Sequence, residues 1–413
     1  MKRWDYGWIV VATLCVTETV SWGIVYYGFP VFLQSMERDL GASRVVVTGA
    51  LSLALAISAF GAIPAGRWID RHGARALMTA GSILATGLVV AWSRVYSVGA
   101  LYAVWAAMGV AMAMILYQPA FAAVVQWFPH RREQALLTVT LAAGFASTIF
   151  MPAEAWLLAW LGWRRALVVL AGVLAAVTIP AHALLLKAPE GIGPGRELRH
   201  VTANDATLGA ALRHTVFWIL AAAFALANFT TTTVGIHMIP YLGQHGYSTR
   251  LGATIVGWIG GMQVPGRLLF VPITAWLGAS WVTGSLFFAE AAAMGLLAAG
   301  ALGIGLVPMI LLYGAAAGML TLAQATVVAD VWGRRHYGAI AGAMAVPANL
   351  ARALGPVGAA ILYARLGGYS RLFWLLAGGL TIAGIAVLVT ERHSTARAGT
   401  REAFATADRS VGS

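Results

Sequence analysis

The chain has 413 residues, of which 60% are hydrophobic and 10% are charged. Soluble domains carry about 25% charged residues, so this composition excludes a soluble enzyme, a nucleic-acid-binding protein and a disordered chain as descriptions of the whole molecule. The basic excess, 27 Lys and Arg against 15 Asp and Glu, is typical of the cytoplasmic loops of a membrane protein, and the single cysteine, Cys15, excludes an intrachain disulfide.

Apolar stretches follow one another along the chain, each close to the roughly 20 residues that a helix needs to cross a bilayer. We expect an all-α membrane protein with twelve transmembrane helices and no separate soluble domain. The first stretch is too long for a cleaved signal peptide and has no clear cleavage site. The predicted spans are 8–34, 46–68, 77–93, 98–126, 135–156, 163–186, 215–242, 252–276, 281–303, 306–330, 339–364 and 371–390.

The basic residues of the loops predict the orientation of the chain. Most of them fall on segments that share a side with the two termini, and the positive-inside rule then places both termini in the cytoplasm. We expect a multi-pass protein of the plasma membrane, the inner membrane of a bacterium. Two basic residues, Arg267 and Arg352, fall inside predicted helices instead.

Composition also predicts the domain organisation. Residues 1–190 and 214–390 are expected to form two six-helix bundles, joined by a cytoplasmic linker at 191–213 that is rich in proline and glycine. Residues 391–413 are polar and lack apolar periodicity, which predicts a disordered cytoplasmic tail.

A constant offset of 205 residues relates the two halves. Parallel six-helix repeats are the architecture of the major facilitator fold, so we expect two pseudo-symmetric halves of that kind. The offset joins Trp127 to Trp332, Gly162 to Gly367 and Gly73 to Gly278.

The loop after the second predicted helix carries a specific motif. Gly66, Asp70, Arg71, Gly73 and Arg75 have the spacing Gly-x-x-x-Asp-Arg-x-Gly-x-Arg. Spacing and location both resemble the loop signature of the major facilitator superfamily. Asp70 could pair with a basic group or a helix N-terminus in one conformation, which would bias a two-state equilibrium and give the motif a gating role. The alternative is a loop that only sets topology.

Further segments resemble one branch of that superfamily, the monocarboxylate transporters and oxalate/formate antiporters. They are Asp5-Tyr6-Gly7-Trp8, Tyr27-Gly28-Phe29-Pro30-Val31-Phe32 and Leu354-Gly355-Pro356. The resemblance implies alternating-access transport of small mono- or dicarboxylates, coupled to proton symport or to anion exchange. It also implies a monomer in the lipid bilayer, with no cofactor.

Arg267 and Arg352 are the candidate anion-binding residues. Arg267 lies about nine residues inside the eighth predicted helix, roughly 13 Å deep in a hydrocarbon core about 30 Å thick. Arg352 lies midway along the eleventh. A guanidinium at that depth costs at least ~2.5 kcal/mol, so each must face water, an acid or a ligand. The resemblance implies that both helices line a central cavity, where two guanidiniums suit a carboxylate. The alternative is a permanent pair with an acid such as Glu18.

Gln263 precedes Arg267 by one helical turn and shares its face. In monocarboxylate transporters, which the chain resembles, an aspartate tied to proton coupling often holds that place. Glutamine cannot titrate, which argues against proton coupling at this position. It also favours an anionic ligand as the counterion of Arg267.

Glu18 is the candidate proton carrier. It forms an i, i+4 stripe with Trp22 and Tyr26 on the first predicted helix, and a buried carboxyl can take up a proton. A static ion pair with Arg352 or Arg267 is the alternative for Glu18.

Hydrogen bonds to a carboxylate could come from Tyr26 or Tyr27, from Tyr117 and from Asn349, which shares a face with Arg352. Tyr117 resembles the fourth-helix tyrosine of carboxylate carriers. The alternative is that each tyrosine only packs between helices.

Other functions fit the sequence less well. An exporter of an amphipathic compound or drug would belong to the same superfamily, but the fifth predicted helix reads Gly144-Phe145-Ala146-Ser147 and lacks the Gly-Pro pattern of drug exporters. Metal, nucleophile and nucleotide motifs are absent from the sequence, so we expect no enzyme. A membrane sensor that binds a ligand without transport is left open.

Overall fold

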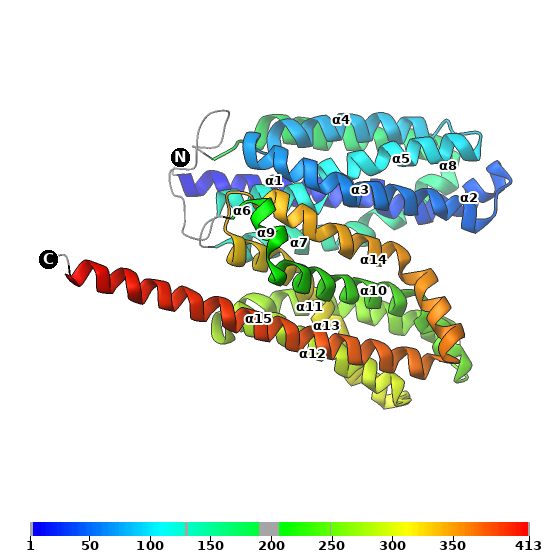
Figure 1. Ribbon diagram of the computed structural model, residues 1–413. Helices are drawn as coiled ribbons and strands as arrows, with labels where there is room; N and C mark the ends of the chain where they lie inside the picture. The colour runs from blue at the N-terminus through cyan, green and yellow to red at the C-terminus, as the bar shows by residue number, and fades with distance from the viewer. Residues whose placement is uncertain (1–2, 129–130, 190–205, 248, 412–413) are drawn as a thin grey trace. The chain divides into compact units, whose positions relative to one another are not determined.

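The computed structural model describes residues 3–128, 131–189, 206–247 and 249–411, and every element in these ranges is a helix (Figure 1). The first half contains α1 (Arg3–Ser21), η1 (Trp22–Tyr27), α2 (Gly28–Leu40), α3 (Arg44–His72), α4 (Ala74–Trp92), α5 (Val98–Ile115), α6 (Tyr117–Trp127), α7 (Arg132–Gly144) and α8 (Ala146–Leu185). The second half contains α9 (Leu208–Arg213), α10 (Thr215–Gln244), α11 (Thr249–Leu277), α12 (Ala279–Ala298), η2 (Gly303–Gly305), α13 (Leu306–Trp332), α14 (Tyr337–Leu366) and α15 (Tyr369–Val411).

Membrane-spanning helices make up most of this structure. Within the described ranges, nine helices are long and apolar enough to cross a membrane, or ten if the two parts of α14 are counted as one span. One of the nine, 132–185, is interrupted by the non-helical Gly162, which divides it in two. α11 adds a further helix of 29 residues. Each of the twelve predicted spans therefore lies on a helix.

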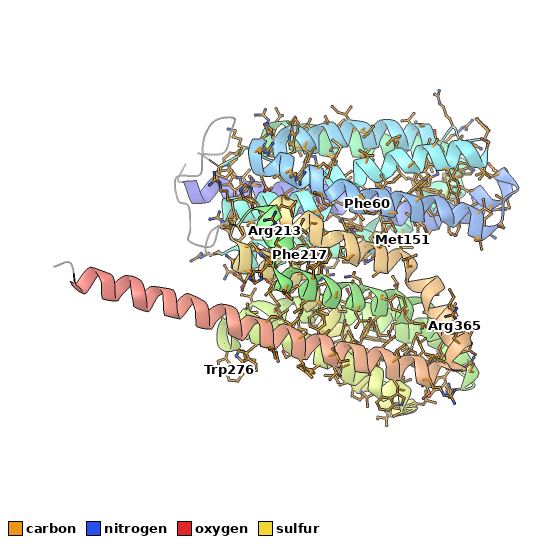
Figure 2. The ribbon with its side chains drawn as sticks, viewed as in Figure 1. Phe60, Met151, Arg213, Phe217, Trp276 and Arg365 are labelled. Carbon is orange, nitrogen blue, oxygen red and sulfur yellow. The ribbon has the colours of Figure 1, made fainter. Side chains whose placement is uncertain are left out.

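The outer faces of the helices are apolar. Phe60 is 56% exposed and Trp276 is 83% exposed, and both are labelled in Figure 2. Large apolar surfaces of this kind mark a membrane interaction, because water solvates them poorly. The exposed faces and the length of the helices together describe an integral multi-pass membrane protein.

Compact packing divides the chain into two units. Unit 1 is Met1–Ala211 with Trp332–Ala353, and unit 2 is Leu212–Val331 with Leu354–Ser413. The segment Trp332–Ala353 lies with unit 1, whereas the sequence placed it in the bundle 214–390. Close packing explains the difference, because a Cβ on Gly66 of α3 would collide with the backbone of Gly338 in α14. Most of the linker predicted at 191–213 lies outside the described residues.

The tail also differs from expectation. α15 continues to Val411, over the stretch 391–411 where the sequence predicted disorder. Alanine and arginine are frequent there, and they are strong helix formers. Local propensity thus extends the helix where apolar periodicity gave no signal.

The repeat is visible in the backbone. Gly73 and Gly278, which precede α4 and α12, have φ of 77° and 83°, and Gly162 and Gly367 have φ of 71° and 75°. Only glycine adopts this region at no steric cost. Trp127 and Trp332 are the last residues of α6 and α13. Residues 205 apart therefore occupy equivalent turns and helix ends.

Local breaks interrupt three of the predicted helices in unit 1, and the fifth, 135–156, is divided at Phe145 between α7 and α8. The first predicted span is α1, the π-helical η1 and α2 rather than one continuous α-helix. The fourth is divided at Leu116, whose ψ of −165° is not helical, and α6 starts again at Tyr117. Pro119 lies in the first turn of α6, where the missing N–H of proline costs no hydrogen bond.

Glycine contacts allow the helices of unit 1 to approach closely. A Cβ on Gly109 of α5 would collide with the carbonyl oxygen of Ala54 in α3 and lie 2.9 Å from Cβ of Ile57. Such small residues at helix interfaces let backbones approach where no hydrophobic force drives association in lipid.

We therefore predict that Gly109→Ala destabilises the protein by about 1–3 kcal/mol, the usual cost of overpacking. A thiol-reactive dye on Cys15, the single cysteine, would follow thermal unfolding in detergent. Gly87→Ala is the matched control, because a Cβ there meets no atom within 4 Å. An unchanged melting temperature for Gly109→Ala would show that this contact is not tight.

Candidate functional site

Glu18 lies in the interior of unit 1, where α1 meets η1. The residue is 0% exposed, and its Oε2 accepts a hydrogen bond of 3.1 Å from Nε1 of Trp22. Its Oε1 is buried and has no hydrogen-bond partner among the described residues. The i, i+4 stripe expected from the sequence is thus a direct contact, and one carboxyl oxygen is left over.

Aromatic side chains surround this carboxyl. Trp22 lies 5.1 Å from Tyr26, 6.5 Å from Tyr27 and 4.9 Å from Tyr117 between ring centroids. Tyr117 in turn stacks on Phe121 of α6 at 5.0 Å. The structure therefore brings Glu18, Tyr26, Tyr27 and Tyr117 into one cluster, contributed by α1, η1 and α6.

The π-helical turn of η1 gives these aromatics their positions. A π-helix bonds i to i+5 and is frequent at functional sites. A Cβ on Gly23, the second residue of η1, would collide with the ring of Phe150 in α8. Glycine at this point lets η1 lie directly against α8, and the following tyrosines continue along the same turn.

The structure adds a second buried acid that the sequence reasoning missed. Glu154 of α8 is 0% exposed, and neither carboxyl oxygen has a partner among the described residues. A Cβ on Gly28, the residue after η1, would lie 2.9 Å from its Oε1. The sequence placed Glu154 two residues from the end of the predicted span 135–156. An acid at the end of a membrane-spanning helix is ordinarily solvated, so its burial was not predicted.

Arg267 and Gln263 are neighbours on α11 in unit 2. A guanidinium nitrogen of Arg267 donates to Oε1 of Gln263 at 3.4 Å, a long hydrogen bond along one helical turn. Both side chains are half-buried. The predicted shared face is therefore confirmed in geometry.

Tight packing of α11 on α13 fixes the backbone around this pair. A Cβ on Gly318 would collide with the carbonyl oxygen of Gln263, and one on Gly314 would lie 2.6 Å from Cβ of Met262. A Cβ on Gly266 would collide with the backbone of Ala315. The residues on either side of Arg267 are thus held in place by backbone contacts.

Arg352 and Asn349 lie on α14 and are half-buried. Both belong to the part of α14 that packs with unit 1, whereas Arg267 and Gln263 belong to unit 2. The two arginines are thus carried by different units. Each has further interactions within the chain, so neither stands isolated.

The loop motif makes a specific contact within unit 1. The two carboxylate oxygens of Asp70 accept hydrogen bonds from the backbone N–H groups of Gly338 at 2.8 Å and Ala339 at 2.9 Å. These are orphan donors in the first turn of α14, and the helix dipole favours a negative charge there. Of the two pairings considered for Asp70, the structure has the helix N-terminus.

The other motif residues support this contact differently. Gly66 lets α3 approach Gly338, and Gly73 has a positive φ that starts α4. Arg71 and Arg75 are exposed. Exposed arginines at a helix end suit the charged surface of a membrane.

Arg334 makes a complementary contact that the sequence reasoning did not anticipate. Its guanidinium donates to the carbonyl oxygens of Val125 at 2.9 Å and Gln126 at 2.8 Å, at the C-terminus of α6. A cation is favoured at that end of a helix. α14 and the turn before it are therefore tied to unit 1 by an acid at one helix terminus and an arginine at another.

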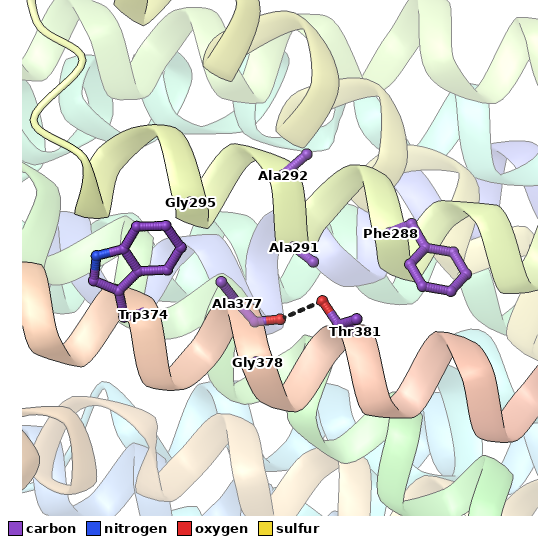
Figure 3. Close-up of a pocket in the computed structure, with 8 residues that line it drawn as sticks. All are labelled: Phe288, Ala291, Ala292, Gly295, Trp374, Ala377, Gly378 and Thr381. Carbon is purple, nitrogen blue, oxygen red and sulfur yellow. Dashed lines mark hydrogen bonds between the residues drawn. The ribbon is translucent and has the colours of Figure 1, made fainter.

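An apolar groove lies elsewhere, between α12 and α15 of unit 2 (Figure 3). It has a volume of about 420 Å³ and is lined by Phe288, Ala291, Ala292, Gly295, Trp374, Ala377, Gly378 and Thr381. The hydroxyl of Thr381 is bonded to the carbonyl oxygen of Ala377 at 2.8 Å, the dashed line in Figure 3. None of the predicted site residues lines this groove, and its apolar lining does not suit an anion.

Comparison with known proteins identifies the architecture. The family model of the Major Facilitator Superfamily matches residues 14–356. The human organic anion transporter MFSD10 (TETRAN) superposes with a TM-score of 0.75 over 92% of this chain and 99% of its own, at 16% identity. A variant of the E. coli fucose:proton symporter FucP has a TM-score of 0.69 over 91% of this chain and 97% of its own, at 14% identity. At sequence identities this low, the structural similarity shows a shared fold.

One curated relative has a similar sequence. The oxalate:formate antiporter of Oxalobacter formigenes is 27% identical over 241 residues, which are 58% of this chain and 56% of the antiporter. The similarity thus spans little more than half of that protein.

Asp70→Asn should lower the stability of the protein by roughly 1–2 kcal/mol, because asparagine keeps one acceptor oxygen but removes the charge at the helix N-terminus. Thermal unfolding followed through Cys15 measures the change. Arg75→Gln, an exposed change in the same loop, should have little effect. Equal melting temperatures for Asp70→Asn and the wild type would mean that the α14 contact adds no stability.

Proposed function

Because the chain belongs to the major facilitator superfamily, and is a membrane transporter rather than an enzyme, we propose that it carries small organic anions, mono- or dicarboxylates, by alternating access. The transport is coupled to proton symport or to anion exchange. The protein works as a monomer in the plasma membrane, the inner membrane of a bacterium, with both termini in the cytoplasm. Residues 1–190 and 214–390 act as the two halves of the transporter, with 191–213 as their linker.

The observation that supports this function most is the placement of Arg267 in α11. Gln263, one turn away, accepts a hydrogen bond from the guanidinium of Arg267. The planar guanidinium matches the two oxygens of a carboxylate, which is why we propose a carboxylate as its ligand. The 27% identity with an oxalate:formate antiporter agrees with this substrate class.

Arg352 is the second proposed anion-binding residue. Asn349, three residues earlier on α14, shares its face and offers an amide N–H to the same carboxylate. Alternating access requires that the substrate bind one state of the protein more tightly than the other.

The aromatic cluster supplies the other proposed hydrogen-bond donors to the anion. Hydroxyls of Tyr26, Tyr27 and Tyr117 can donate hydrogen bonds to a carboxylate, and the ring of Trp22 packs among them. An aromatic lining excludes water and strengthens the attraction between the anion and the guanidiniums. Small planar anions fit such a lining better than strongly hydrated inorganic ones.

The motif at 66–75 controls which side is open. With Asp70 bonded to α14, that end of the protein is held closed, and release of Gly338 and Ala339 opens it. The exposed Arg71 and Arg75 fix the loop at the membrane surface. The cost of breaking the cap is small enough for a substrate-dependent equilibrium.

Removal of either arginine should weaken carboxylate binding. A hydrogen bond to a charged group contributes about 1.5–3 kcal/mol, so Arg267→Gln and Arg352→Gln should each lower the apparent affinity about 10- to 100-fold. Uptake of labelled oxalate, formate, lactate and succinate into proteoliposomes measures this. Arg94→Gln, at an exposed position, is the control. Wild-type transport by both variants would refute the anion site.

Glu18 is the proposed proton carrier, through the carboxyl oxygen that Trp22 leaves free. Under proton symport, Glu18→Gln should abolish accumulation driven by a pH gradient while leaving substrate exchange at equal pH. Trp22→Phe, which removes the hydrogen bond and keeps the carboxyl, should keep the coupling. Gradient-driven accumulation that persists in Glu18→Gln would remove Glu18 from this role and leave the anion site untouched.

A further inference from the structure

Two carboxyl groups flank the π-helical turn of unit 1. Glu18 is bonded to Trp22, the first residue of η1, and Glu154 lies against Gly28, the first residue after it. Gly23 and Gly28 face Phe150 and Glu154, which are one helical turn apart on α8. Phe150 and Glu154 therefore lie on one face of α8, and this face packs along η1.

Glu154 lies well inside the membrane-spanning part of α8. It is eight residues from Gly162, where α8 is interrupted, and this corresponds to about 12 Å along the helix. The pair between Arg164 and Asp39, at 3.5 Å, lies beyond that interruption. Glu154 is thus separated from the charged end of the bundle by about three helical turns.

The contacts of Glu154 come from the segments packed on this part of α8. The titratable groups on the neighbouring segment are Glu18 on α1 and Tyr26 and Tyr27 on η1. Within the described residues, both carboxyl oxygens of Glu154 are buried and neither has a hydrogen-bond partner. An ionised carboxylate in such a place is strongly disfavoured, since no hydrogen bond stabilises its charge. A carboxylate at such a position can become neutral by binding a proton.

We propose that Glu154 is a second proton-binding site of the transport cycle, distinct from Glu18. When η1 exposes it to water on one side, the carboxylate takes a proton from hydronium and becomes a neutral acid. The neutral acid is buried as η1 packs back on α8, and exposure on the other side returns the proton to water. The inference rests on the proposed function for its substrate, while proton binding itself depends on Glu154 and η1 alone.

The π-helical turn explains how one residue can be both buried and reachable. A π-turn contains one residue more than an α-turn, and its conversion to α-helix rotates the flanking residues relative to each other. Gly28 moves with that rotation, and its backbone lies against the Glu154 carboxyl. Access to Glu154 is thereby tied to the positions of Tyr26 and Tyr27, which belong to the proposed substrate site.

Infrared difference spectroscopy of the reconstituted protein, recorded between low and high pH, tests the proton directly. The wild type should show the C=O stretch of a protonated carboxylic acid that is lost at high pH, and Glu154→Gln should lack one such component. Glu290→Gln is the matched control, because Glu290 of α12 is also 0% exposed with both oxygens unpartnered among the described residues. It should keep the component.

A transport measurement supplies the second readout. For a coupled proton, a gradient of one pH unit drives about tenfold accumulation of substrate, and Glu154→Gln should reduce this ratio while exchange at equal pH continues. If glutamine prevents folding, as judged by thermal unfolding through Cys15, Glu154→Asp replaces it and should shift the pH at which the infrared band is lost.

The outcomes separate this inference from the proposed function. A wild type that exchanges carboxylates with no response to a pH gradient, and whose infrared component persists in Glu154→Gln, overturns the proton site and leaves anion transport standing. A wild type that moves no tested carboxylate refutes the proposed substrate, while the infrared titration still decides whether Glu154 binds a proton.

Discussion

The cost of an unsatisfied polar group in lipid governs this structure. Water does not reach the bilayer core, so every polar group there must find its partner within the protein. Most side chains of the spans comply locally: the hydroxyls of Thr13, Thr178 and Thr230 each bond to the carbonyl oxygen four residues earlier on the same helix. Against this background, a buried carboxyl with free oxygens stands out. Glu18, Glu154 and Glu290 are exceptions to the constraint, and the first two adjoin the one π-helical turn among the described elements.

The same constraint shapes the contacts that a transporter must break and remake. Asp70 and Arg334 satisfy backbone groups at helix termini rather than pairing with opposite side chains. Such bonds are directional and are weakened by water, so a small displacement of α14 exchanges them for hydration. Glycines on both helices, Gly66 and Gly338, bring the backbones close enough for the carboxylate to reach two N–H groups at once. Packing and electrostatics thus act at the same point, and we propose that this point is a gate.

Substrate and proton sites can share one element in this architecture. η1 presents Tyr26 and Tyr27 from the turn that also contacts α8 through Gly23. A change in that turn moves Tyr26 and Tyr27 together with Gly28, which lies against Glu154. In the proposed mechanism, coupling between an anion and a proton needs no long pathway through the protein, because one short segment would contact both ligands.

The sequence by itself determined the helical architecture and the repeat, because apolar length and glycine position are local properties. Gly73 and Gly278 needed no tertiary information to be matched, and the stripe of Glu18, Trp22 and Tyr26 follows from helical periodicity alone. The pairing of Gln263 with Arg267 is local in the same sense. Tertiary structure decided what depends on approach between distant segments. Asp70 reaches α14 across 268 residues, and the break at η1 exists because glycines meet Phe150 and Glu154 of α8. Glu154 itself looks like an ordinary helix-end acid until packing buries it, since burial is a property of the neighbours and not of the residue.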